Sequence, residues 1–264
     1  MNLRNALLGP PVPLRVVEGR TEVFGIPFSP LSRPGFVAEV ARRLSQGERG
    51  VTLLTPDARA AAHILLRPQR TRVYRESDLV ACDGTGLAWA ARACGRPLPR
   101  VPGVDLAWDL CCHGAHRGWT VYLLGGSPGV AEAAARTLRA ALPGIRVVGQ
   151  HHGYFSGPGP AEEVRRLQPD LLLVGMGFPR QEQWILAHRS LGAGLLIGVG
   201  GTFEVWSGRI PRAPATWRRV GLEWLWKALL RPRRLLGLWC VPFLLYHIAL
   251  GWLRTKLVRG EHVP

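Results

Sequence analysis

The stretch LLLVGMGFPRQEQWI, Leu171 to Ile185, decides the fold. Its apolar run ends in Gly175-Met176-Gly177, and a new segment starts at Pro179. This order predicts a buried parallel strand, a tight turn and a helix whose first turn accommodates the proline. The glycines let backbone approach a ligand closely, and the free N–H groups at Arg180 to Glu182 favour an anion such as a diphosphate.

A second copy of the arrangement follows directly. Leu195 to Gly201, LLIGVGG, is again an apolar run that ends in glycines, and Thr202 to Glu204 comes next. Such glycines could simply form crossover turns, because a lone G-x-G is a weak signal. Charged and amide side chains stand beside both glycine turns, which favours a shared ligand crevice.

Strands alternate with helices through most of the chain, which predicts an α/β fold, a Rossmann-like parallel sheet covered by helices on both faces. A helix is also expected over 34–44, and 23–28 reads as an edge strand or a β-turn. Strands are expected at 51–54, 79–82, 121–124 and 145–148, and in the apolar runs that begin at Leu171 and at Leu195.

Ligands of open parallel sheets bind outside the carboxyl ends of the strands. Five loops fall at such ends, and we expect them to face one site. They are 55–57, Asp83, 125–126, 177–181 and 200–204.

Asp83 closes a predicted buried strand. It could act as a general base if burial raises its pKa, or it could cap the following helix, and the residues leave both roles open. Thr55 could orient a substrate, whereas the position of Asp57 at a helix start favours capping. In RVPGVDL, Arg100 could hold a phosphate or a sugar carboxylate, or be a solvated surface arginine, and Asp105 lies at the start of a helix expected over 104–112.

The chain has 264 residues and a formal net charge of +16, with Lys227 and Lys256 as its only lysines. This charge implies a polyanionic partner, namely nucleic acid, an anionic membrane or a phosphorylated substrate, unless it reflects the composition bias of the host. The five cysteines have no paired spacing, and the N-terminal apolar run is too short for a signal peptide, so we expect a reducing, cytoplasmic location. With no D-x-D and no spaced histidine pair, neither a metal nor another cofactor is expected.

Three regions differ in composition. Residues 1–20 are a loose lead-in, 21–208 the α/β core, and 209–264 an appendage rich in arginine and tryptophan. Within it, 235–253 carries no formal charge and is about as long as the roughly 20 residues that a bilayer requires. Pro242 and the basic residues on both flanks fit a helix that lies in the membrane interface equally well. A helix of a soluble core is the alternative without a membrane. The sequence leaves open whether the segment spans the bilayer or lies in its interface.

The ordered motifs resemble the WecG/TagA/CpsF glycosyltransferase family. The resemblance covers about residues 23–235. The motifs are CDGTG from Cys82, RVPGVDL from Arg100, VYLLGGSPGVAEAAA from Val121, LLLVGMGFPRQEQWI from Leu171, IGVGGTFEVWSG from Ile197, and RAP followed by GLEWLWKALLRPRRL between Arg212 and Leu235.

The resemblance implies metal-independent, inverting transfer of N-acetylmannosamine, its uronic acid or glucuronic acid from a UDP-sugar to a lipid-diphosphate-linked acceptor at the cytoplasmic membrane face. It also implies that Asp83 is catalytic, that Thr55 and Gln181 position substrate, and that a basic appendage docks on the membrane and closes over the site. Departures from the family pattern stand at Asp57, Arg180, Glu204 and Trp226-Lys227, and they leave the sugar unassigned.

The predicted function is therefore a membrane-associated glycosyltransferase, whose partners are a UDP-sugar donor, a lipid-linked acceptor, an anionic membrane surface and, as an open point, further copies of the chain. The alternatives are a basic nucleic-acid-binding Rossmann-like module and a pseudoenzyme scaffold; the charge beside an apolar tail argues against nucleic acid. Predicted substrate contacts are Asp57, Arg100, Asp105, Gly125, Gly126, Gly175, Gly177, Arg180, Glu182, Gly198, Gly200, Gly201, Phe203, Arg212, Arg231 and Arg234.

Overall fold

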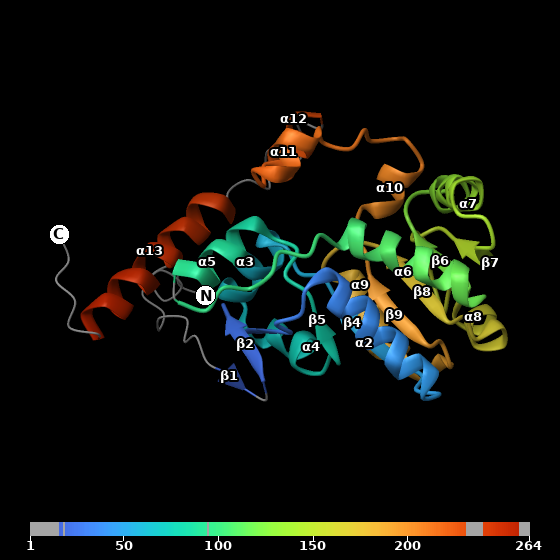
Figure 1. Ribbon diagram of the computed structural model, residues 1–264, viewed down its shortest axis with the longest axis horizontal. Helices are drawn as coiled ribbons and strands as arrows, with labels where there is room; N and C mark the ends of the chain where they lie inside the picture. The colour runs from blue at the N-terminus through green and yellow to red at the C-terminus, as the bar shows by residue number, and fades with distance from the viewer. Residues whose placement is uncertain (1–15, 18, 94, 231–239, 259–264) are drawn as a thin grey trace.

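A six-stranded parallel sheet forms the centre of the computed structural model, which describes residues 16–17, 19–93, 95–230 and 240–258 (Figure 1). The strand order is β5-β4-β9-β8-β6-β7, and every neighbouring pair is parallel. This confirms the predicted α/β fold. The strands are β4 (Val51–Leu54), β5 (Leu79–Val80), β6 (Thr120–Gly125), β7 (Arg146–His151), β8 (Leu171–Gly175) and β9 (Leu195–Gly198).

Both faces of the sheet are covered, because successive side chains of a strand point to opposite faces. Leu53 packs in one core and Leu54 in the other. Helices on the Leu53 side are α2 (Arg33–Ser45), α6 (Gly103–Arg117), α7 (Val130–Ala141) and α10 (Thr202–Trp206). Those on the Leu54 side are α3 (Ala58–Leu66), α4 (Arg72–Arg75), α5 (Thr85–Ala93), α8 (Ala161–Leu167) and α9 (Arg180–Ala187).

The chain leaves neighbouring strands toward opposite faces. From β8 it continues into α9 on the Leu54 side, whereas from β6 and β9 it continues into α7 and α10 on the Leu53 side. Where adjacent strands diverge in this way, their carboxyl ends leave a crevice for a ligand. The topology therefore places the candidate site at the ends of β6, β8 and β9.

The N-terminal part forms a small antiparallel sheet of β1 (Val16–Val17), β2 (Arg20–Val23) and β3 (Ile26–Phe28). The predicted edge strand or turn over 23–28 is thus a hairpin, with Phe24 and Gly25 at φ values of 53° and 77°. Two short 3₁₀ turns, η1 (Pro68–Thr71) and η2 (Arg189–Leu191), complete the core.

Beyond Gly208 the described chain forms α11 (Ala215–Arg219), α12 (Glu223–Leu230) and α13 (Cys240–Val258). Helix α13 lies against α3 and α5 (Figure 1), and Cys240 and Leu244 are buried in that contact. The apolar helix was expected over 235–253, and the structure describes a helix over 240–258. Residues 231–239 lie outside the described residues. Within the described ranges, no helix is both long enough and apolar enough to cross a bilayer.

Candidate active site

A carboxylate and a hydroxyl converge near the carboxyl ends of β4 and β5. Thr55 follows β4, and the half-buried Asp83 lies three residues beyond β5. Both side chains face Gly103, the first residue of α6: a Cβ atom there would lie 2.8 Å from Thr55 Oγ1 and 3.4 Å from Asp83 Oδ2. The glycine therefore leaves open the space between the two predicted catalytic groups.

The Thr55 hydroxyl also joins this pair to the next strand. It donates a hydrogen bond of 2.7 Å to the carbonyl of Gly198, the last residue of β9. A buried side chain with a partner that close has a defined rotamer. Thr55 therefore links the carboxylate end of the crevice to its glycine loops.

Gln181 connects two of those loops. Its Oε1 accepts hydrogen bonds from the N–H of Gly177 after β8, at 3.3 Å, and from the N–H of Gly200 after β9, at 3.0 Å. The side chain is only 4% exposed. The predicted substrate-positioning residue thus binds the backbone of both loops.

Gly177 and Gly200 line open space. Their φ values are +75° and +53°, in the left-handed region that glycine adopts without steric cost. A Cβ atom at either position would have no neighbour within 4 Å. The two turns therefore present backbone to open space.

The glycine turn after β6 lies beside the same crevice. Gly126 donates to the carbonyl of Gly175 at 3.0 Å, and Gly153 donates to the carbonyl of Gly126 at 2.8 Å. A Cβ atom at Gly125 would lie 2.3 Å from that same Gly175 oxygen, so no side chain fits there. Since a Cβ atom at Gly175 would lie 2.9 Å from the carbonyl oxygen of Gly200, the glycine turns after β6, β8 and β9 lie side by side.

Four further predicted residues lie at the loops or pack behind them. Asp57 caps α3, as expected, because its Oδ1 accepts from the N–H of Arg59 at 2.9 Å and of Ala60 at 3.1 Å. Glu182 is 2% exposed and Phe203 1%. Burial raises the pKa of Glu182 to about 7, and its Oε1 accepts from Gln181 Nε2 at 3.0 Å. Gly201 lies directly before α10.

Predicted arginines join the C-terminal helices to the core. Arg100 donates from Nη1 to the carbonyl of Arg218 at 3.0 Å, and its Nη2 lies 3.9 Å from a carboxylate oxygen of Glu223. Arg212 forms an ion pair with Asp105. Because Arg218 belongs to α11 and Glu223 to α12, the contacts of Arg100 attach both helices to the core. The Arg212–Asp105 pair attaches the segment before α11 to α6. Arg231 and Arg234 lie outside the described residues.

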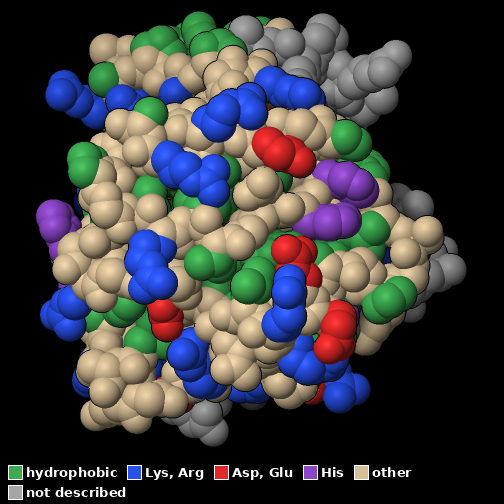
Figure 2. Space-filling model, turned by 90° about the vertical axis from the view of Figure 1, so that its right-hand side faces the viewer, with side chains coloured by type: hydrophobic (Ala, Val, Ile, Leu, Met, Phe, Trp, Pro, Cys, Tyr) green, Lys and Arg blue, Asp and Glu red, His purple; other side chains and the backbone are tan. Residues whose placement is uncertain are grey.

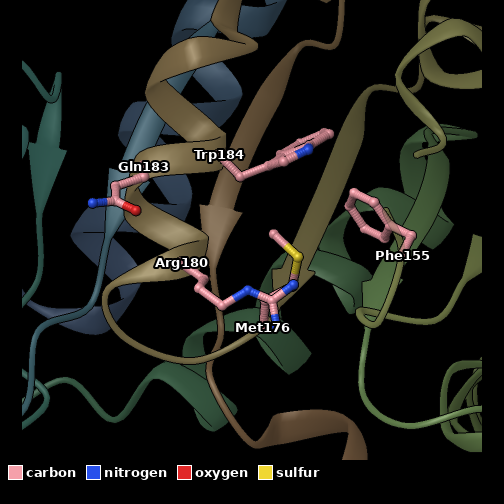
Figure 3. Close-up of a pocket in the computed structure, with 5 residues that line it drawn as sticks. All are labelled: Phe155, Met176, Arg180, Gln183 and Trp184. Atoms are coloured by element: carbon pink, nitrogen blue, oxygen red, sulfur yellow. The ribbon is translucent and has the colours of Figure 1, made fainter. Parts of the chain in front are cut away.

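A cavity of about 310 Å³ opens between α9 and the segment before α8, lined by Phe155, Met176, Arg180, Gln183 and Trp184 (Figure 3). Figure 3 shows Trp184 directed toward Phe155, and Arg180 beside Met176. Arg180 donates to the carbonyl of Gly153 at 3.0 Å. Sequence reasoning missed Phe155 and Trp184: Phe155 lies in the glycine-rich segment after β7, which was not expected to face the site, and Trp184 lies within α9, beyond its first turn.

Arg209 is another residue outside the predicted site. It donates from Nη1 to the hydroxyl of Ser127 at 2.8 Å, in the glycine turn after β6. On the face that Figure 2 shows, Lys and Arg side chains are scattered, with acidic side chains between them. Among the described residues, no group of three or more His, Cys, Asp or Glu is placed to hold a metal ion.

Comparison with known proteins adds independent findings. The model of the "Glycosyl transferase WecG/TagA/CpsF family" matches residues 21–258. A relative in Staphylococcus aureus strain NCTC 8325 is named N-acetylglucosaminyldiphosphoundecaprenol N-acetyl-beta-D-mannosaminyltransferase; it is 29% identical over 236 residues, which cover 87% of this chain and 92% of the relative. Relatives of the same name in strains COL and MRSA252 match with the same identity and coverage.

Proposed function

The chain belongs to the WecG/TagA/CpsF family and is a glycosyltransferase, and from this premise we propose that it moves a sugar with inversion from a UDP-sugar to a polyprenyl-diphosphate-linked acceptor. The transferred sugar is N-acetylmannosamine, its uronic acid or glucuronic acid. The product serves the synthesis of a cell-surface polysaccharide or a polymer of the teichoic-acid type.

One observation carries the proposal: Asp83 and Thr55 face a common point, and the Thr55–Gly198 hydrogen bond joins that point to the glycine loops. In the proposed reaction, the Asp83 carboxylate takes the proton of the acceptor hydroxyl as its oxygen attacks the anomeric carbon. The bond from that carbon to the diphosphate breaks, and its electron pair leaves with UDP. The configuration at the anomeric carbon is inverted. A single base suffices for a displacement of this kind.

The glycine loops suit the leaving diphosphate. Gly177 and Gly200 border open space next to the start of α9, where helix N–H groups favour anions. Arg180 and Arg209 stand at the neighbouring loops and add positive charge. We propose that these groups, without a metal ion, stabilise the charge that develops on UDP.

The relative's name directs the choice of substrates. It describes an acceptor of N-acetylglucosaminyl diphosphoundecaprenol and a transferred N-acetyl-β-D-mannosaminyl group. UDP-N-acetylmannosamine with an acceptor of that type is therefore the first pair to test. The departures at Asp57, Arg180 and Glu204 make the uronic acids the next donors to compare.

We also propose that the chain binds the cytoplasmic face of the membrane through its C-terminal helices. Seven large hydrophobic side chains are exposed in the described part of the chain, and six belong to α5 or to the region from α11 to α13. Apolar side chains beside arginines suit an anionic lipid surface. The six are Trp89, Val220, Trp224, Leu229, Leu245 and Tyr246.

The test is a transfer assay with the full chain in the presence of EDTA. UDP-N-acetylmannosamine, its uronic acid, UDP-glucuronic acid and UDP-N-acetylglucosamine are each offered with the lipid-linked acceptor, and UDP release and the product's anomeric configuration are measured. We expect one of the first three to give a β-linked product. Absence of transfer from every donor, in the presence of anionic vesicles, would overturn the proposal. Co-sedimentation with anionic but not neutral vesicles tests the membrane part.

A further inference from the structure

Glu182 is a carboxylate inside the core beside the glycine loops. It follows Gln181 on α9 and is 2% exposed. Its Oε1 accepts a hydrogen bond of 3.0 Å from Gln181 Nε2, and its Oε2 is buried with no hydrogen-bond partner. A buried carboxylate with one oxygen unsatisfied is costly, so a role is needed to explain it.

The contact with Glu182 determines which way the Gln181 amide points. With Nε2 bound to the carboxylate, Oε1 faces the N–H groups of Gly177 and Gly200 and accepts from both. If the amide turned over, its oxygen would face the carboxylate and its NH₂ would face two N–H donors. Both contacts would be repulsive, so the carboxylate excludes the turned orientation.

We propose that Glu182 is a positioning residue that acts through Gln181 to set the separation of the Gly177 and Gly200 loops. The inference rests on the proposed function, in which these loops hold the diphosphate of the donor. Glu182 itself does not touch the substrate. Its removal would leave the Gln181 amide free to turn and would release the two backbone N–H groups from their shared acceptor.

The charge of Glu182 is set by the elements packed on α9. Asp57 and Arg59 act on it from the start of α3, and the buried Tyr74 hydroxyl, which also has no hydrogen-bond partner, is electrostatically coupled to it from α4. Strands β4, β8 and β9 present uncharged side chains, and Arg189 of η2 is bound to Asp78 at 3.1 Å. The backbone N–H of Glu182 itself also lowers the pKa of this carboxylate, and the α4 arginines Arg72 and Arg75 pair with Glu76 and Glu22 instead. Because none of the ion pairs among the described residues includes Glu182, burial dominates.

Burial raises the pKa of Glu182 to about 7, so its carboxylate is ionised above neutral pH and protonated below it. The ionised carboxylate accepts a stronger hydrogen bond than the neutral acid. Above neutral pH the Gln181 amide is therefore held most firmly, and as the pH falls through 7 the hold weakens. Donor binding should follow the same course.

The experiment compares Glu182→Gln, Glu182→Ala and the wild type, with Glu163→Gln as the matched control. Glu163 is a half-buried carboxylate that accepts from the Tyr122 hydroxyl at 2.6 Å and contacts neither loop. The steady-state kcat and the KM for the UDP-sugar are measured from pH 5.5 to 8.5. Titration calorimetry with UDP alone gives the affinity independently of turnover.

We expect Glu182→Ala to raise the KM and weaken UDP binding by about tenfold, with kcat less affected, because the buried amide loses its acceptor. Glu182→Gln keeps an acceptor oxygen and should stay within about threefold of the wild type at pH 8, but it should lack the inflection near pH 7. Glu163→Gln should keep both the affinity and the inflection.

Two results would overturn the inference: a folded Glu182→Ala with wild-type UDP affinity, or a Glu182→Gln that keeps the inflection. If Glu182→Ala does not fold, the pH profile of Glu182→Gln decides alone. If the wild type binds UDP and transfers sugar, and the variants behave like it, only the positioning role of Glu182 is refuted. A wild type that does neither refutes the proposed function and, with it, the role of Glu182.

Discussion

The two ends of the candidate site present different chemical groups. At the end formed by β4, β5 and α6, the chemistry belongs to side chains, the half-buried Asp83 and the buried Thr55, which face Gly103. At the end formed by β6, β8 and β9, it belongs to backbone in glycine turns, with Gln181 tying two of them together. In the proposed function, proton transfer uses the titratable group at the first end. The diphosphate would meet the start of α9 and the nearby arginines at the second end, because the N–H groups of Gly177 and Gly200 already donate to Gln181.

The surroundings of the two ends agree with this division. The carboxylate end adjoins the C-terminal helices, because Thr85 Oγ1 donates to the carbonyl of Gly221 at 2.9 Å and Arg100 to that of Arg218 at 3.0 Å. The glycine end adjoins the cavity beside Arg180. A lipid-linked acceptor held by the C-terminal helices would therefore reach Asp83 first.

The largest effect is expected from Asp83→Asn, which keeps the shape of the side chain and removes its basicity. We expect kcat to fall by roughly a thousandfold, the usual contribution of a positioned base. The KM for the UDP-sugar should change less than about threefold, since the glycine end is untouched. Steady-state rates and UDP calorimetry check both values. A kcat within tenfold of the wild type would remove the distinction between the two ends.

Gly103→Ala should have the next largest effect. Its Cβ would lie 2.8 Å from Thr55 Oγ1, closer than atoms approach, so Thr55 must leave the Gly198 carbonyl. We expect kcat to fall by roughly 10- to 100-fold, since misplacement of about 1 Å costs about that much. Gly86→Ala, where a Cβ meets nothing within 4 Å, is the control. Equal activities of the two variants would contradict the convergence on Gly103.

Gly200→Ala tests the glycine end. The position has a φ of +53° and open space around it, so alanine fits but must adopt a left-handed conformation at a cost of about 1–2 kcal/mol. The loop should shift away from Gln181, raising the KM for the donor about fivefold while kcat falls less. Gly47→Ala is the control with the same strain, at φ +79° in open space, far from the site in sequence. A drop in kcat without a change in KM would assign the loop to chemistry instead.

The sheet and the position of its site could be predicted from the sequence because the signals are local. A strand such as Leu171–Gly175, buried on both faces, reads as a continuous apolar run. Asp83 and the glycines stand directly after such runs, and carboxyl ends of parallel strands share one edge of the sheet. Their common site therefore followed from their positions alone.

Other parts of the site depend on information that local sequence does not carry. The rotation of α9 decides that Gln181 and Glu182 are buried while Arg180 is exposed, although the three are adjacent. The pairing of Arg212 with Asp105 joins residues 107 positions apart, and nothing in either motif indicates its partner. The wall that Phe155 adds to the cavity depends on how the segment after β7 folds back.

The smallest effect concerns the link between the carboxylate end and the C-terminal helices. Arg212→Ala removes an ion pair with Asp105 that is partly exposed, with side-chain exposures of 31% and 20%, and such pairs contribute about 1 kcal/mol or less. We expect a two- to fivefold loss of kcat/KM for the lipid-linked acceptor and none for UDP binding. Asp105→Ala removes this pair and also the contact of Asp105 with Arg33 at 3.7 Å, so its loss should be equal or slightly larger. The double variant should lose no more than Asp105→Ala alone, because Arg212 then has no further partner in this pair to lose. Arg165→Ala, which breaks the exposed pair with Glu162 on α8, should leave acceptor kinetics unchanged. Additive losses from Arg212 and Asp105 would show that the two act separately, and the C-terminal helices would then be coupled to the site through Arg100 and Thr85 instead.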